Sequence, residues 1–326
     1  MSAADALETL LTAGGAELAR GLRATEARLA EVAEGHGPEL GRHASGTLSA
    51  GGKRLRPVIV FLCGGSGEGL LRAAAAVELL HMASLVHDDV LDRAPLRRGA
   101  PTVFASGGRG AAVATGDLLF SRAFAELRRT GSEPAVAALS EASSALARGE
   151  LVQRADAWSA SVSAERYLQR CELKTASLFA AAARLGALLG DDSTPADADA
   201  LAGFGRRIGL AFQILDDVLD VSGPAERTGK HRGTDLLDGT VTLPLILARE
   251  RDPDLAAMDL RALVSSPAQA DAVCDRIART GALGAAREEA LHHVAEAKAA
   301  LTGAQLPESR GEALQLVADG VVERYA

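Results

Sequence analysis

The sequence predicts an all-α protein that forms a single domain over residues 1–326. Apolar residues make up 48% of the chain and aromatic residues only 3%. Alanine is abundant, and small side chains let helices pack closely. Apolar residues recur at helical spacing over long stretches, whereas no stretch alternates apolar and polar residues as a half-buried strand would. No linker is apparent, and we expect one domain of roughly ten or more helices.

Each expected element is bounded by proline, glycine or a polar segment. In the first part of the chain we expect helices at 4–34, 55–62 and 70–92, a turn at 36–38, and loops at 63–69 and 93–110. Further helices are expected at 111–129, 134–159, 164–189, 196–221 and 236–249. The polar, glycine-rich segment 222–235 is a candidate mobile lid. Beyond residue 250, short helical patterns alternate with breaks.

The bulk properties favour some classes of protein and exclude others. The formal net charge is −8, and no basic run is interleaved with aromatic residues, which argues against nonspecific nucleic-acid binding. Cys63, Cys171 and Cys274 are widely spaced and fit small core residues in a reducing compartment. There is no signal-peptide pattern, and charged residues interrupt the longest apolar run, Leu70–Leu85. We therefore expect a cytoplasmic protein without a transmembrane segment.

The pentapeptide Asp-Asp-Val-Leu-Asp occurs twice, at Asp88–Asp92 and at Asp216–Asp220, and each copy ends an apolar stretch. Residues four apart share one face of a helix, so the first and last acids of each copy converge. The middle acids, Asp89 and Asp217, are rotated by about 100° and suit a supporting contact or a metal-bound water. Mg²⁺ typically takes one or two carboxylates and completes its shell with water and substrate phosphates. The two copies therefore predict two walls of a metal-filled pocket for a polyanion.

Three groups of basic residues could supply the remaining positive charge for a diphosphate. They are Lys53 with Arg56, Arg97 with Arg98, and Lys174 with Thr175 together with Lys230 in the candidate lid. The first group follows two glycines at a helix start, where free N–H groups and the helix dipole attract an anion. Arginine forks, as in the second group, bind phosphate oxygens bidentately. Each group alone is typical of solvated surface, as is a lone acidic cluster, and their association is what favours a site.

Six motifs carry a specific resemblance over most of residues 50–250. They are GGKRLRP (51–57), ELLHMASLVHDDVLDRAPLRRGAPTV (78–103), GDLLFSRAF (116–124), ELKTASLF (172–179), GLAFQILDDVLDVSG (209–223) and TGKHRGTDLLDGTVTLPL (228–245). In this order they resemble the trans-type isoprenyl diphosphate synthases, the polyprenyl synthetase family. One departure is visible: the family commonly has Gly-Lys before Thr-Leu-Pro, but Thr240 follows Gly239 here, which puts one auxiliary cationic contact in doubt.

The resemblance implies a homodimer of helical bundles, each with antiparallel helices around a deep central cavity. It implies Mg²⁺-dependent, head-to-tail condensation of isopentenyl diphosphate with an allylic prenyl diphosphate, with three Mg²⁺ ions on the allylic substrate. Asp88 and Asp92 match the ligands of two ions and Asp216 that of the third, and Asp89, Asp217 and Asp220 match residues that bind waters or orient ligands. Lys53, Arg56, His81 and Arg98 match the isopentenyl diphosphate site, and Arg97, Lys174, Thr175, Gln213 and Lys230 match the surroundings of the allylic substrate.

Product length is expected to depend on the helix that carries the first acidic motif. A helix rises about 5.4 Å per turn, close to one extended isoprene unit. Ala83 and Ser84, upstream of Asp88, are small, whereas short-chain synthases place aromatic residues there. The sequence therefore predicts a product of geranylgeranyl length or longer.

Other functions remain open at this point. They are a farnesyl synthase, a class I terpene cyclase, a noncatalytic subunit of a heteromeric synthase, and a helical scaffold with solvated acids. A cyclase normally has an Asn/Ser/Glu-type second motif and lacks the isopentenyl diphosphate grip. A noncatalytic subunit typically loses acids from its motifs, whereas both copies are intact here.

Overall fold

A computed structural model describes residues 14–49, 52, 54–97, 99–190, 194–223 and 231–323. Within these residues the regular structure is helical, which confirms the predicted all-α fold class. The exception is a short antiparallel ribbon in which β1 (Leu96–Arg97) pairs with β2 (Ala100–Pro101). The candidate lid falls mostly on residues 224–230, which lie outside the described residues.

The contacts within the chain define two compact units. The first comprises Met1–Ser144, Leu178–Gly205 and Ala299–Val317. The second comprises Ala145–Ser177, Arg206–Lys298 and Ala318–Ala326. A single domain over the whole chain therefore stays a prediction.

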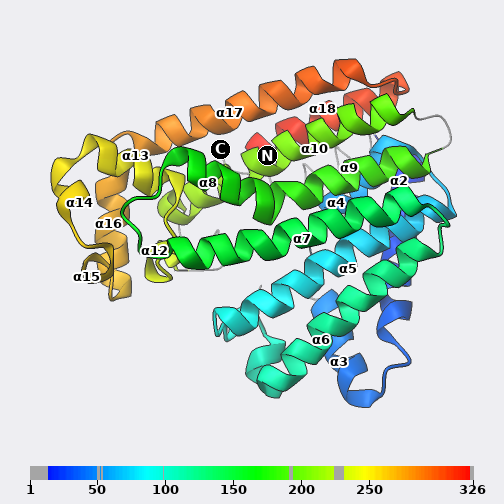
Figure 1. The fold of residues 1–326 in the computed structure, drawn as a ribbon, viewed down its shortest axis with the longest axis horizontal. Coiled ribbons are helices and arrows are strands. Elements are labelled where there is room, and N and C mark those ends of the chain that lie inside the picture. Colours follow the sequence, from blue (N-terminus) through cyan, green and yellow to red (C-terminus); the bar gives the residue numbers. More distant parts are fainter. Residues whose placement is uncertain are drawn as a thin grey trace. The chain divides into compact units, whose positions relative to one another are not determined.

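The first unit is built around one central apolar helix. Its elements are α2 (Gly15–Ala33), α3 (Pro38–Ser49), α4 (Leu55–Gly64), α5 (Glu68–Leu91), α6 (Val103–Arg128), and parts of α7 (Glu133–Asp156), α9 (Ser177–Leu189), α10 (Pro195–Ser222) and α18 (Glu308–Glu323), with the 3-10 turn η2 (Leu301–Gly303). Helix α5 packs against α2, α4 and α6 (Figure 1). Most of its residues are apolar, and Ala73–Ala76 are fully buried, as expected of a helix in a core. By length and composition α5 could also span a membrane, but 67% of its most apolar window is buried inside the fold.

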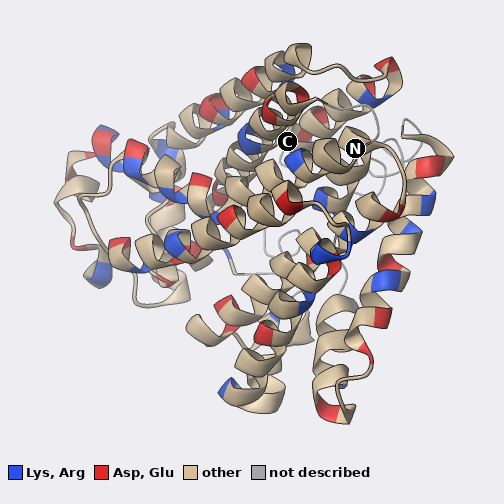
Figure 2. Ribbon diagram, turned by 45° about the vertical axis from the view of Figure 1, so that its right-hand side comes forward, with Lys and Arg blue, Asp and Glu red and all other residues tan. Residues whose placement is uncertain are grey.

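Buried ion pairs fasten the helices of the first unit to one another. Acidic and basic residues are interspersed along the helices (Figure 2). Glu126 of α6, whose side chain is fully buried, accepts hydrogen bonds from Arg28 of α2 at 2.7 and 3.0 Å and from Arg72 of α5 at 3.1 Å. A buried carboxylate is costly unless it is paired, so these contacts select the arrangement in which all three helices meet.

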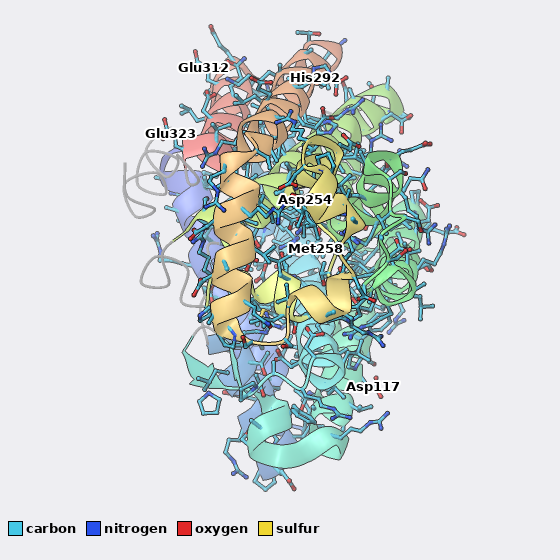
Figure 3. The ribbon with its side chains drawn as sticks, turned by 90° about the vertical axis from the view of Figure 1, so that its left-hand side faces the viewer. Asp117, Asp254, Met258, His292, Glu312 and Glu323 are labelled. Carbon is cyan, nitrogen blue, oxygen red and sulfur yellow. The ribbon has the colours of Figure 1, made fainter. Side chains whose placement is uncertain are left out.

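The second unit consists mainly of shorter helices. Its elements are α8 (Ala164–Cys171), the π-helical turn η1 (Glu172–Ala176), α12 (Thr234–Leu237), α13 (Leu243–Arg251), α14 (Pro253–Ala257), α15 (Leu260–Leu263), α16 (Pro267–Arg279), most of α17 (Ala282–Ala300), and the remaining parts of α7, α10 and α18. Polar residues cap several of these helices: Ser163 starts α8, and Asp252 starts α14. Asp254 and Met258, near the two ends of α14, lie at the surface (Figure 3).

The structure corrects several expected boundaries. The expected loop at 93–110 is interrupted at Thr102, whose hydroxyl accepts a hydrogen bond from the Ala105 amide and starts α6 there. Inside the expected loop, Gly108 has a φ of 78° and puts a kink in α6. The expected helix at 236–249 is divided into α12 and α13, since Gly239 has a φ of 74° that breaks the helix. The sequence did not predict α3, and α16 to α18 are longer than the expected short patterns. The three cysteines are free and buried, as predicted.

Candidate active site

The first acidic motif closes α5 and divides its acids into accessible and buried ones. Asp88 is partly exposed, and Asp92, the C-terminal cap of the helix, is exposed. Asp89 is only 4% exposed and accepts a hydrogen bond from Nε of Arg97 at 2.7 Å. Arg97 lies on strand β1, so the ribbon returns the chain to the end of α5. The arginine compensates the charge of the one acid that the fold has removed from water.

A glycine of α6 lets that helix approach the start of the first acidic motif. A Cβ atom at Gly116 would lie 2.2 Å from Nε2 of His87, so a larger residue there would displace this ring. The same nitrogen lies 3.4 Å from a carboxylate oxygen of Asp117, the residue after the glycine. The motif GDLLFSRAF thus begins with two residues that receive the side chain next to Asp88.

The residues upstream of Asp88 differ in exposure. His81 is partly exposed, and its carbonyl oxygen accepts a hydrogen bond from the hydroxyl of Ser84 at 2.8 Å. Ser84 is itself partly exposed, whereas Ala83 is fully buried. Of the two small residues assigned to product length, only Ser84 presents accessible surface to a substrate.

The segment GGKRLRP contains a buried arginine, Arg54, whose role the local sequence pattern does not indicate. Arg54 has a φ of 47°, a left-handed conformation, and stands at the N-terminal cap of α4. Its guanidinium donates hydrogen bonds to Glu26 at 2.5 Å and to Glu78 at 2.6 Å. Two residues later, the guanidinium of Arg56 lies over the ring of Phe179, 4.4 Å from its centroid. Arg54 therefore fixes the backbone from which Arg56 projects.

Lys53, Arg98 and Lys230 were predicted to bind substrate, and all three lie outside the described residues. Their roles stay predictions.

The second acidic motif, on α10, shows the same division of exposure as the first. Asp216 is exposed, and Asp217 is 4% exposed. Asp220 is partly exposed, and its carboxylate accepts a hydrogen bond from the backbone N–H of Asp235 at 3.2 Å. Its carbonyl oxygen also accepts one from the N–H of Gly233 at 2.9 Å, so the motif holds the chain that precedes α12.

Asp217 accepts hydrogen bonds at both carboxylate oxygens. Nε2 of Gln213 donates to Oδ1, and the hydroxyl of Tyr167 donates to Oδ2, each at 2.7 Å. Oε1 of Gln213 in turn accepts from the hydroxyl of Thr175 at 2.7 Å. Burial and the nearby charge of Asp235 raise the pKa of Asp217, although the hydrogen bond from Tyr167 opposes the change. Burial also raises the pKa of Tyr167 well above its ordinary value, so the phenol keeps its proton.

Lys174 and Thr175 lie in the π-helical turn η1 between α8 and α9. Such turns are rare and often occur at functional sites. Lys174 donates a hydrogen bond to Glu150 of α7, which also accepts one from Arg154 at 2.8 Å. Burial alone would raise the pKa of Glu150, but the charge of Lys174 lowers it below its ordinary value. Nothing in the local sequence pattern around Glu150 marks this contact, so only the fold reveals it.

The carboxylates of both motifs fit a divalent cation that arrives with a phosphate. Among the residues that the structure describes, no three His, Cys, Asp or Glu side chains form a group that could hold a metal ion by themselves. Mg²⁺ typically needs only one or two carboxylates when phosphate oxygens supply other ligands. The outer acids of each motif, which are exposed or partly exposed, provide such oxygen donors.

The fold and these motifs define an all-α isoprenoid synthase. The family model for polyprenyl synthetase matches residues 38–280. Heptaprenyl diphosphate synthase component 2 of Geobacillus stearothermophilus is 38% identical over 294 residues, which are 89% of this chain and 92% of that protein. Geranylgeranyl diphosphate synthase of Methanosarcina mazei is 41% identical over 213 residues, 63% of this chain and 65% of that protein.

A solved structure agrees with the sequence comparisons. The polyprenyl synthase of Caulobacter crescentus, complexed with calcium and isoprenyl diphosphate, superposes with a TM-score of 0.88 at 35% identity and covers 98% of each chain. The chain belongs to the polyprenyl synthetase family, and it is a prenyltransferase that forms prenyl diphosphates.

Proposed function

We propose that the chain is an all-trans polyprenyl diphosphate synthase that uses Mg²⁺ to condense isopentenyl diphosphate with an allylic diphosphate. One observation carries this proposal within the family. Both acidic motifs keep their outer acids at accessible positions and bury the middle acid against a dedicated partner. This division matches acids that bind ions and acids that hold the site together. A chain that no longer catalysed the reaction would have no need to keep both arrangements.

The metal assignment follows from accessibility and donor chemistry. Asp88 and Asp92 would hold two of three Mg²⁺ ions, and Asp216 the third. Asp220, which is partly exposed, would bind a metal-bound water. When bound, Mg²⁺ would stabilise the negative charge that forms on the departing diphosphate.

The side chains of the chain would bind the substrates and steady the charge that develops in the reaction. Lys53, Arg56, His81 and Arg98 would hold isopentenyl diphosphate, and Arg97, Lys174 and Lys230 the allylic diphosphate. The allylic C–O bond breaks and its electron pair leaves with the diphosphate. The double bond of isopentenyl diphosphate then forms the new C–C bond, and the released diphosphate takes the proton that is lost. Fixed oxygen dipoles of Thr175 and Gln213 would stabilise the allylic cation without reorganisation.

We propose a product of geranylgeranyl length or longer. The support is the absence of bulk at Ser84, the partly exposed small residue one turn before Asp88. A relative that makes geranylgeranyl diphosphate and one that belongs to a heptaprenyl diphosphate synthase fit this range. Ser84→Phe should shorten the product, because its ring enters space that a growing chain would use. Ala83→Phe is a poorer test, since Ala83 is fully buried and a larger residue there would strain the core.

We also propose a cytoplasmic homodimer. The alternative is a heteromer, which the name of the Geobacillus relative, a numbered component of a synthase, brings into view. Sedimentation of the purified chain, with an activity assay on the same sample, separates the two: activity only after a second protein is added would refute the homodimer.

One assay tests the function. Purified protein is incubated with Mg²⁺, labelled isopentenyl diphosphate and allylic starters of increasing length, and the products are sized by chromatography. We expect diphosphates of at least geranylgeranyl length, and a chain that stops at farnesyl diphosphate would refute the product assignment. Cyclic hydrocarbons would indicate a terpene cyclase. Asp88→Ala should lose orders of magnitude in turnover while staying folded, and near-normal turnover would refute the metal assignment.

A further inference from the structure

A series of three hydrogen bonds connects four side chains of the second unit. Thr175 in η1 donates to Gln213 on α10, Gln213 donates to Asp217 one turn later, and Tyr167 on α8 donates to the other oxygen of Asp217. All three distances are 2.7 Å. Tyr167 is fully buried, and Thr175 is 8% exposed, so water has little access to either end.

The chain of hydrogen bonds has one direction. The structure turns the NH₂ group of the Gln213 amide toward Asp217, and an ionised carboxylate, which only accepts hydrogen bonds, requires this orientation. The amide oxygen then faces Thr175, and the Thr175 hydroxyl donates its single proton in a hydrogen bond to that oxygen. With Asp217 ionised, flipping the amide would place two oxygen acceptors 2.7 Å apart, without a proton between them. The arrangement leaves lone pairs of the Thr175 and Gln213 oxygens for a cation.

Tyr167 closes the buried end of this chain. Without its hydroxyl, one oxygen of Asp217 would lose its donor in a place that is 4% exposed. A buried acceptor without a partner is costly, and the carboxylate would rotate or admit water to recover one. Either change loosens the Gln213 amide, because Asp217 is what fixes its orientation.

We propose that Tyr167 is a positioning residue of the prenyl-transfer site, acting through Asp217 to hold the oxygens of Gln213 and Thr175 toward the allylic cation. This inference rests on the proposed function. A fixed dipole needs no reorganisation when charge develops, whereas a side chain free to rotate does. Tyr167 would therefore affect the chemical step more than the binding of either substrate.

The variant Tyr167→Phe removes the hydroxyl and keeps the ring, over which the guanidinium of Arg170 lies at 5.2 Å from the centroid. We expect kcat to fall about 10-fold or more, somewhat less than the loss on removing a group that contacts the transition state directly. The KM values for both substrates should change less than about 3-fold. The control is Thr25→Val on α2, where an equally buried hydroxyl donates to the Gly21 carbonyl at 2.8 Å. It should lower stability without lowering kcat.

A binding measurement separates positioning from a purely structural role. The first probe is a prenyl diphosphate analogue in which a protonated nitrogen replaces the carbon that becomes cationic. The second is the matching neutral analogue, which has carbon at that position. By calorimetry with Mg²⁺, Tyr167→Phe should lose about 10-fold of the preference for the charged analogue, while the neutral one binds as in the wild type. An unchanged preference, or a kcat within 2-fold of wild type, would overturn the proposal.

The two failures are distinguishable. If the wild-type chain makes no prenyl diphosphate with any starter, the proposed function fails. If it is active, but Tyr167→Phe and Thr25→Val lose only stability, the proposed function stands and Tyr167 is structural.

Discussion

Gly149 on α7 offers a sharp test of how the structure positions Lys174. A Cβ atom at Gly149 would lie 2.6 Å from the backbone nitrogen of Lys174 and 2.8 Å from its Cα atom. These are backbone atoms of the π-helical turn η1, which cannot move aside as the end of a flexible side chain can. Glycine at this position therefore sets the distance between α7 and the turn that carries the predicted catalytic lysine.

The expected effect of Gly149→Ala follows from these distances. Non-bonded carbon atoms approach to about 3.5 Å, and the Cβ atom would lie 2.8 Å from Cα of Lys174, so α7 and η1 must separate by about 0.7 Å. Overpacking of this kind costs about 1–3 kcal/mol of unfolding free energy. A displacement of about 1 Å in a reacting group can lower the rate about 10²-fold. We expect kcat to fall between about 10-fold and 100-fold, with a folded protein.

The assay pairs this variant with Gly284→Ala on α17. A Cβ atom at Gly284 would meet nothing within 4 Å, so the same chemical change should be neutral or stabilising by up to about 1 kcal/mol. Because both variants exchange glycine for alanine within a helix, the difference in their urea unfolding free energies mainly reports the overpacking cost. If Gly149→Ala matches Gly284→Ala in both stability and kcat, the close approach of α7 to η1 does not position Lys174.

Two further predictions concern one buried and one partly buried carboxylate. Glu126→Ala should lower the unfolding free energy by about 3 kcal/mol, since it removes the buried carboxylate that arginines of two other helices share. Arg28 and Arg72 keep only their more exposed partners Glu31 and Glu68. Burial raises the pKa of Glu126, but its interactions with Arg28 outweigh this effect and lower the pKa in the folded state. The stabilisation from Glu126 is therefore full above the unfolded pKa of about 4.3 and is lost as the pH falls through the folded pKa. Acid unfolding of Glu126→Gln that tracks the wild type would contradict this. Glu150→Gln should lower kcat/KM for the allylic diphosphate about 10-fold, because Lys174 loses a charged partner; the exposed Glu141→Gln on the same helix is the control, and equal kinetics for both would show that Glu150 does not hold the lysine.

The sequence was a good guide to the fold class and to the position of the acidic motifs. Helical periodicity and the scarcity of aromatic residues sufficed for the all-α prediction. It failed where a contact distant in sequence decides the local structure. The apolar pattern continues through Gly239, but the backbone N–H of Trp158 donates to the Gly239 carbonyl at 2.8 Å, and the Trp158 ring lies where a side chain at Gly239 would stand. No local pattern contains that information.

The same limit applies to the residues that support the candidate site. Periodicity predicted that Asp89 and Asp217 would turn away from their neighbours, and both are buried. It could not supply their partners. Tyr167 lies 50 positions from Asp217, and Glu150 lies 24 positions from Lys174. Tyrosine and glutamate at helical spacing are ordinary features of a helix, so only the fold distinguishes these two.

Identical pentapeptides have acquired different supports, and this difference has consequences. Asp89 is held by a cation, Arg97, whereas the direct partners of Asp217 are the neutral donors Tyr167 and Gln213. A full positive charge compensates a buried carboxylate strongly, but a guanidinium has only donors and does not fix the orientation of a neighbouring amide. Neutral donors compensate it less and transmit a direction, because each has a defined donor and acceptor end. The first motif is therefore built to keep its charge balanced, and the second to orient Gln213. Exchanging the hydrogen-bond partners of Asp89 and Asp217 would leave both pentapeptides intact. It should still impair the second motif more than the first, because only the second orients Gln213.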